Sequence, residues 1–143
     1  GMVAEVGDAL DLSRVHFVGR VPYQTYLRIL QISRAHLYLT YPFVLSWSMM
    51  EAMAVQCPIA ASATAPVTEM ITDRETGLLV DFFDPAPLVD AAEELLTDRG
   101  LADRLGQAAR AHIVRNYDLR SVCLPRQTEL VRAAAAGREP DIG

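Results

Sequence analysis

The chain has 143 residues, of which 51% are hydrophobic, and a formal net charge of -5 at pH 7. These numbers predict one ordinary domain with a sizeable core, and the apolar runs are far shorter than the ~20 residues of a membrane-spanning helix. The acidic balance and the scattered basic residues argue against non-specific nucleic-acid binding, which needs clustered Lys and Arg.

The N-terminal third predicts a strand between two helical segments. Met2–Leu10 is expected to be a short helical stretch or the tail of a longer helix. Val15–Val18 is rich in β-branched residues and closed by Gly19, which predicts a short buried strand. Pro22 then opens a helix that runs to about Ser33, since proline fits the first helical turn.

The central segment predicts strand, helix and strand in succession. Ala35–Thr40 is the first strand, and Ser46 or Ser48 is a good N-cap for the helix that follows. That helix covers Met49–Ala54 and ends before a proline, after which Ile59–Ala61 forms a second short strand.

The next elements repeat this alternation. A short helix starts at Ala65, a turn covers Asp73–Gly77, and Leu78–Val80 is another strand. Alternating strands and helices predict an α/β fold, a Rossmann-like parallel sheet with helices on both faces.

The C-terminal part is expected to be helical. Apolar residues recur at helical spacing in three segments, Pro87–Thr97, Leu101–Asn116 and Asp118–Ala136, the last bent near Pro125. We expect a domain over residues 2–132 and a disordered tail over 133–143.

The elbow between the strand ending at Thr40 and the following helix is the strongest functional signal. Backbone N–H groups near Leu45, Ser46 and Trp47, together with the helix N-terminus, are suited to holding a diphosphate. Glu51 lies just beyond, where its carboxylate can accept hydrogen bonds from sugar hydroxyls. An ordinary capped helix with a solvated glutamate fits the same spacing.

Other candidate residues give weaker functional signals. Trp47 either stacks on a ligand or packs at the helix start. His16, His36 and His112 show no metal-ligand spacing, and no Ser/His/Asp or Cys/His constellation is visible, so we expect no metal and no cofactor.

Two features favour a reducing, cytoplasmic environment. Cys57 and Cys123 are far apart, lie in apolar settings and lack Cys-x-x-Cys spacing, so free thiols are expected. The first residues lack a basic start and a long apolar run, so we expect no signal peptide.

Several motifs together resemble the donor-binding domain of retaining GT-B glycosyltransferases of the group 1, or family 4, type. The central motif is Glu51-Ala52-Met53-Ala54, followed by a Cys-Pro turn and an Ile-Ala-Ala-Ser strand. The segments that also match are Val15–Val21, Glu75–Val80 and Ala109–Tyr117.

The resemblance implies specific roles. This class uses nucleotide-diphosphate sugars without a metal, and Glu51 would bind the ribose of the donor. The remaining roles it implies are phosphate binding by the backbone of Leu45, Ser46 and Trp47, proximity to the base for Gly19, Arg20 and Val21, and a sugar pocket lined by Phe43 and Val44.

The chain departs from the family pattern in three ways. Phe43 replaces the glutamate that usually stands eight positions before the helix glutamate, and Val44–Trp47 replaces a glycine-rich loop. An N-terminal acceptor domain and the first two strands of the donor domain are also missing from the sequence. We therefore expect the sheet to be incomplete at its N-terminal part and the chain alone to be inactive, since cations that neutralise the diphosphate lie on those strands in relatives.

The missing strands imply an apolar, unpaired edge at Leu37–Leu39, covered by a rearranged Val15–Val18 strand or by a second copy of the chain. Self-association is thus an expected property.

The resulting interpretation is a donor-domain fragment of a hexosyltransferase. Its parent would transfer sugar from a nucleotide sugar to a glycan or lipid-linked acceptor in polysaccharide synthesis, in the cytoplasm and with peripheral membrane contact. A non-catalytic binding or assembly module with the same fold is the alternative. A sugar-nucleotide epimerase fits the Glu-Ala-Met-Ala segment less well.

Overall fold

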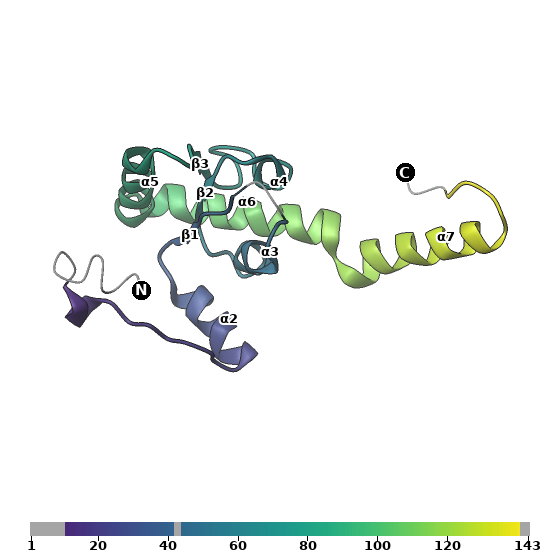
Figure 1. Cartoon of the computed structure of the whole chain (residues 1–143), viewed down its shortest axis with the longest axis horizontal. Helices are drawn as coiled ribbons and strands as arrows, with labels where there is room; N and C mark the ends of the chain where they lie inside the picture. Colours follow the sequence, from purple (N-terminus) through teal and green to yellow (C-terminus); the bar gives the residue numbers. More distant parts are fainter. Residues whose placement is uncertain (1–10, 42–43, 141–143) are drawn as a thin grey trace.

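Three short parallel strands lie at the centre of the molecule, whose computed structural model describes residues 11–41 and 44–140 (Figure 1). The strands are β1 (His36–Tyr38), β2 (Ile59–Ser62) and β3 (Leu78–Val80), in the spatial order β1-β2-β3. Their parallel register and helical connections confirm the predicted α/β fold.

Helices connect and follow these strands. Their bounds are η2 (Leu12–Arg14), α2 (Tyr23–Ile32), α3 (Trp47–Ala54), α4 (Ala65–Thr68), α5 (Pro85–Thr97) and α6 (Arg99–Tyr117), then a π-helical turn η3 (Leu119–Cys123) and α7 (Leu124–Ala135). Helices α2 to α6 match the predicted segments to within a few residues, because each begins at a local capping or proline signal.

Helices cover both faces of the sheet, and β2 shows this residue by residue. Ile59 and Ala61 pack into a core that includes Met53 of α3, whereas Ala60 between them packs with Leu95 of α5. Successive side chains of a strand point to opposite faces, so the wholly buried β2 has a core on each side.

Helix α6 lies directly against the turn that links α3 to β2. A Cβ atom at Gly106 would come within 2.4 Å of the backbone oxygen of Gln56, so only glycine allows this approach. One turn further along, the Arg110 guanidinium donates a hydrogen bond to the Ala54 carbonyl. These contacts fix the position of α6 relative to α3 and to the turn that follows it.

The prediction of a buried strand at Val15–Val18 is wrong. The segment is not part of the described sheet, and its side chains at Phe17 and Val18 are 62% and 54% exposed. β-Branched residues favour an extended backbone, but a strand also needs a hydrogen-bonding neighbour, and none of the described residues pairs with this segment. Figure 1 shows it running apart from the sheet, below it in this view.

The predicted unpaired edge is present in the described sheet. Strand β1 has β2 as its single neighbour there, and Leu37 and Leu39 are about half exposed at 48% and 50%. The Val15–Val18 segment does not cover them.

The predicted C-terminal helical segment Asp118–Ala136 is present as the π-helical turn η3 followed directly by α7. It begins where it was predicted to begin, because the Asp118 carboxylate accepts hydrogen bonds from the N–H groups of Arg120 and Ser121 and so caps it. Pro125 sits in the first turn of α7, where its missing N–H costs nothing. Helix α7, yellow-green in Figure 1, extends away from the sheet.

No helix among the described residues is both long and apolar enough to cross a membrane. The predicted helical stretch Met2–Leu10 lies outside the described residues.

Candidate functional site

The elbow that leads from β1 into α3 lies at the carboxyl end of the sheet, where open α/β sheets bind their ligands. Ser46, one of the two predicted candidates, is the N-cap of α3, and its hydroxyl accepts a hydrogen bond from the Ser48 N–H at 3.3 Å. The two hydroxyls also lie 3.0 Å apart. A capped helix start of this kind presents a positive dipole end to any anion nearby.

Two buried side chains from the sheet hold this elbow. The Tyr38 hydroxyl accepts a hydrogen bond of 2.8 Å from the Ser46 N–H. The Ser62 hydroxyl accepts from the Thr40 N–H and donates to the Thr40 carbonyl, both at 3.1 Å. Tyr38 is 7% exposed and Ser62 is fully buried, so these three hydrogen bonds are partly buried.

Glu51 faces helix α2, from which two tyrosines approach it. Hydrogen bonding with the Glu51 carboxylate raises the pKa of Tyr23. Burial and then the negative charge of Glu51 raise the pKa of Tyr26 to about 12. The Tyr26 hydroxyl is buried and has no hydrogen-bond partner among the described residues. The predicted ribose-binding acid thus lies beside two tyrosines of α2.

The other predicted site residues of the elbow differ in their exposure to solvent. Val44 and Trp47 are 69% and 76% exposed at the elbow, and Leu45 is partly buried against the core. Phe43 lies outside the described residues, so its predicted place in the sugar pocket is not described.

The loop predicted to lie near the base leads directly into α2. Gly19 has φ 63°, a left-handed backbone that favours glycine, and Arg20 is exposed. Val21 is half-buried just before Pro22, the N-cap of the helix that brings Tyr23 to Glu51. The structure therefore links the loop Gly19–Val21 to Glu51 through α2.

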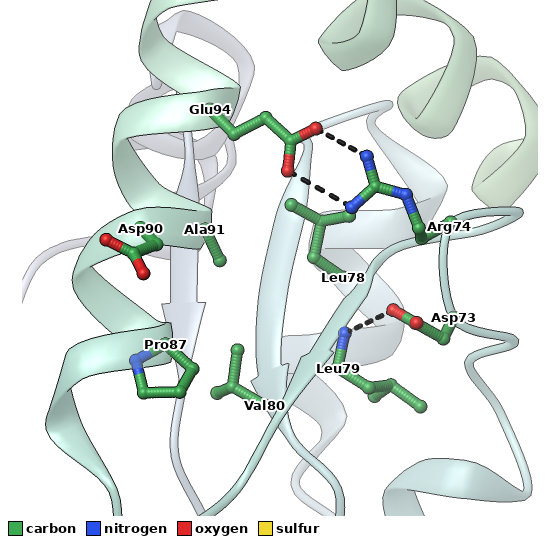
Figure 2. A pocket seen from close by; sticks show the side chains of 9 residues that line it. All are labelled: Asp73, Arg74, Leu78, Leu79, Val80, Pro87, Asp90, Ala91 and Glu94. Carbon is green, nitrogen blue, oxygen red and sulfur yellow. Dashed lines mark hydrogen bonds and ion pairs between the residues drawn. The ribbon is translucent and has the colours of Figure 1, made fainter.

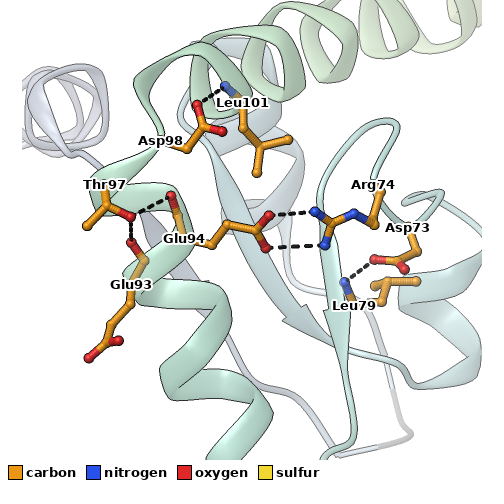
Figure 3. A network of polar contacts seen from close by, with 8 residues as sticks. All are labelled: Asp73, Arg74, Leu79, Glu93, Glu94, Thr97, Asp98 and Leu101. Carbon is orange, nitrogen blue, oxygen red and sulfur yellow. Dashed lines mark hydrogen bonds and ion pairs between the residues drawn. The ribbon is translucent and has the colours of Figure 1, made fainter.

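A hollow of about 210 Å³ lies between β3 and α5 (Figure 2). Three of its polar side chains are already paired: both guanidinium NH groups of Arg74 bond to the Glu94 carboxylate, and Asp73 accepts from the Leu79 N–H at 2.8 Å. Near this ion pair, the Thr97 hydroxyl donates to the Glu93 carbonyl at the end of α5, and the Asp98 carboxylate accepts from the Leu101 N–H at the start of α6 (Figure 3). These groups stabilise the edge of the sheet, and nothing in the hollow marks a ligand.

The described residues contain no candidate metal centre. No group of three or more His, Cys, Asp or Glu side chains in this part of the chain is placed to hold an ion. Cys57 and Cys123 are both free, as predicted. Burial raises the pKa of the Cys57 thiol to about 11, which makes it a poor nucleophile near neutral pH.

Sequence reasoning located Ser46 and Glu51 but missed Tyr38, Ser62 and Tyr23. The missed residues interact with residues distant in sequence; Ser62, for example, forms hydrogen bonds with Thr40. A polar residue at the end of a buried strand, as in Ile-Ala-Ala-Ser, is the one local signal that was available for them.

Known proteins resemble this chain in sequence and in fold. It is 40% identical over 63 residues to D-inositol 3-phosphate glycosyltransferase of Corynebacterium diphtheriae, a match that covers 44% of this chain and 15% of the relative. It is 38% identical over 63 residues to the protein of that name from Salinispora arenicola, covering 44% of this chain and 14% of the relative. The matched part is thus about one seventh of these relatives' length.

Among solved structures, sucrose-phosphate synthase from Thermosynechococcus elongatus superposes with a TM-score of 0.81 at 28% identity, over 95% of this chain and 34% of that one. The C-terminal domain of the group 1 glycosyl transferase LpcC from Francisella tularensis gives 0.64 at 20% identity, over 82% and 60%. The latter likeness concerns the fold alone.

The profile of the family "Glycosyl transferases group 1" matches residues 7–112, which include β1 to β3, the elbow and Glu51. The chain therefore belongs to the group 1 glycosyltransferases, and its fold is that of a GT-B C-terminal domain.

Proposed function

We propose that the chain is the donor-binding part of a glycosyltransferase that takes a hexose from a nucleotide-diphosphate sugar without a metal. The acceptor would be a glycan or a lipid-linked glycan, and the parent enzyme would work in the cytoplasm, in peripheral contact with the membrane. The observation that carries the proposal is the arrangement of a Ser46-capped helix start with Glu51 about one turn inside it.

The chemistry of this arrangement suits a nucleoside diphosphate. The N-terminus of α3 favours negative charge, both on the bound diphosphate and on the leaving group that forms as the glycosidic bond breaks. A carboxylate accepts hydrogen bonds only, so Glu51 suits the two hydroxyls of a ribose. Tyr23 would then orient the Glu51 carboxylate toward the nucleotide.

Calorimetric titration of UDP, GDP and ADP into the wild-type chain and Glu51→Ala tests this proposal. We expect one base to be preferred, and Glu51→Ala to weaken binding of that nucleotide about 10- to 100-fold, as for a charge-assisted hydrogen-bonded pair. The control is Glu93→Ala, which removes an exposed carboxylate of α5 and should leave the affinity unchanged.

The 2′-deoxy nucleotide sharpens the experiment. The 2′-deoxy nucleotide should bind the wild-type chain more weakly than the parent nucleotide does. Glu51→Ala should bind the two nucleotides with nearly equal affinity, because loss of the 2′-hydroxyl and loss of the carboxylate remove the same contact. Equal losses in both proteins would refute the role of Glu51. No binding of any nucleotide to the wild-type chain would refute the proposal itself.

The exposed edge of β1 favours a second candidate, a non-catalytic assembly module. Leu37 and Leu39 present an apolar strand edge that another chain could pair with. Light scattering that shows a stable dimer, together with no nucleotide binding, would favour this candidate, whereas a monomer at high concentration would exclude assembly through a second copy.

A further inference from the structure

We propose that Tyr38 and Ser62 are positioning residues that set the geometry of the phosphate-binding elbow. The proposal rests on the proposed function, and it adds two residues that the sequence motifs do not identify. We define the elbow as the described residues 40, 41 and 44–46 of the connection between β1 and the N-cap of α3.

Ser62 fixes the beginning of the elbow. The last paired residues of β1 and β2 are Tyr38 and Ala61, so Thr40 lies beyond the regular backbone ladder. The Ser62 hydroxyl bonds both the N–H and the carbonyl of Thr40, and in this way one side chain replaces the backbone partner that a longer strand would supply. Thr40 therefore leaves the sheet in a defined direction.

Tyr38 fixes the end of the elbow. Its ring belongs to the core on the α3 side of the sheet, and its hydroxyl takes the N–H of Ser46. The first residue outside α3 is thereby tied to β1, eight positions earlier in the chain. The Ser46 N–H serves as an anchor in this arrangement, so phosphate contacts fall to the neighbouring N–H groups of Leu45 and Trp47.

The need for such anchors follows from the sequence of the elbow. No glycine occurs between Thr40 and Met53, so the backbone cannot reach left-handed conformations at low cost to direct its N–H groups. Recognition of an anion by backbone N–H groups needs positions held to within about 0.5 Å, which the three partly buried hydrogen bonds at the elbow ends would help to provide.

The variants Tyr38→Phe and Ser62→Ala test the proposal, with Tyr117→Phe, on the far end of α6, as the matched control. The first measurement is amide hydrogen exchange without ligand. Exchange of the Ser46 amide should become about 10-fold faster in Tyr38→Phe, and that of the Thr40 amide in Ser62→Ala, with neither changed in Tyr117→Phe.

The second measurement compares UDP, GDP or ADP, whichever the wild-type chain prefers, with the corresponding nucleoside. Each anchor variant should weaken diphosphate binding about 3- to 10-fold, the range for one lost hydrogen bond, and leave nucleoside binding unchanged. A purely structural role would instead weaken both ligands by the same factor.

The outcomes separate the two hypotheses. If the wild-type chain binds the diphosphate and the variants keep the wild-type ratio of diphosphate to nucleoside affinity, the positioning role is refuted and the proposed function stands. Unchanged exchange of the Ser46 and Thr40 amides would also refute it. If the wild-type chain binds no nucleotide, the proposed function fails and the positioning role fails with it.

Discussion

Replacing Gly106 with alanine should destabilise the fold, although alanine is the better helix former. The new Cβ would lie 2.4 Å from the Gln56 backbone oxygen and 3.2 Å from its carbonyl carbon. Both are backbone atoms that no rotamer change can move, so α6 must shift away from the α3–β2 turn. Overpacking of this kind costs about 1–3 kcal/mol, and the gain in helix propensity returns up to about 1 kcal/mol. We expect a net loss of about 1–2 kcal/mol, or a Tm lower by about 3–7 °C.

Urea unfolding followed by circular dichroism measures this change. Gly100→Ala in the same helix is the control, because its Cβ would meet one atom, a carboxylate oxygen of Asp98, at an ordinary 3.4 Å. It should raise stability by a few tenths of a kcal/mol, up to about 1 kcal/mol. If Gly106→Ala proves as stable as Gly100→Ala, the close packing of α6 on the turn is not a constraint and the reasoning is wrong.

Three further predictions concern ionisable groups. At pH 8 a thiol reagent should label Cys123 in the native chain and label Cys57 only after denaturation, since Cys57 is 2% exposed with its pKa raised to about 11. Because the folded-state pKa of Tyr26 is also raised, from 10 to about 12, its stabilising contribution should be complete below pH 10 and lost as the pH rises toward 12; urea midpoints should fall less over this range in Tyr26→Phe. Arg74→Ala removes an exposed ion pair with Glu94 and should cost less than about 1 kcal/mol, a difference that 1 M NaCl should abolish and that a salt-independent loss would contradict.

Local signals were enough to predict most elements. Leu78–Val80 has the predicted bounds because a turn precedes it and its residues are strand formers. The start of α3 was predicted because an N-cap serine contacts residues only two or three positions away. Where a cap or a turn decides the structure, the sequence of a few residues contains the information.

Contacts between distant residues decided the rest. Val15–Val18 has the composition of a strand, yet a strand forms only with a neighbour, and composition does not reveal whether one is present. In the candidate site, the pairing of Ser62 with Thr40 spans 22 positions, and the approach of Tyr23 to Glu51 depends on how α2 packs on α3. Periodicity indicates which face of an element is buried but not what lies opposite.

The two edges of the described sheet differ in whether they can accept another strand. At the β3 edge the Leu79 N–H already donates to Asp73, and the Arg74–Glu94 pair stands beside it, whereas the β1 edge carries no such cover among the described residues. Two copies that joined through β1 would be related by a twofold axis, and both outer edges of the joint sheet would then be β3. At each of these outer edges the Leu79 N–H is already bonded to Asp73, so this carboxylate would oppose further growth of the sheet as well as holding one turn in place.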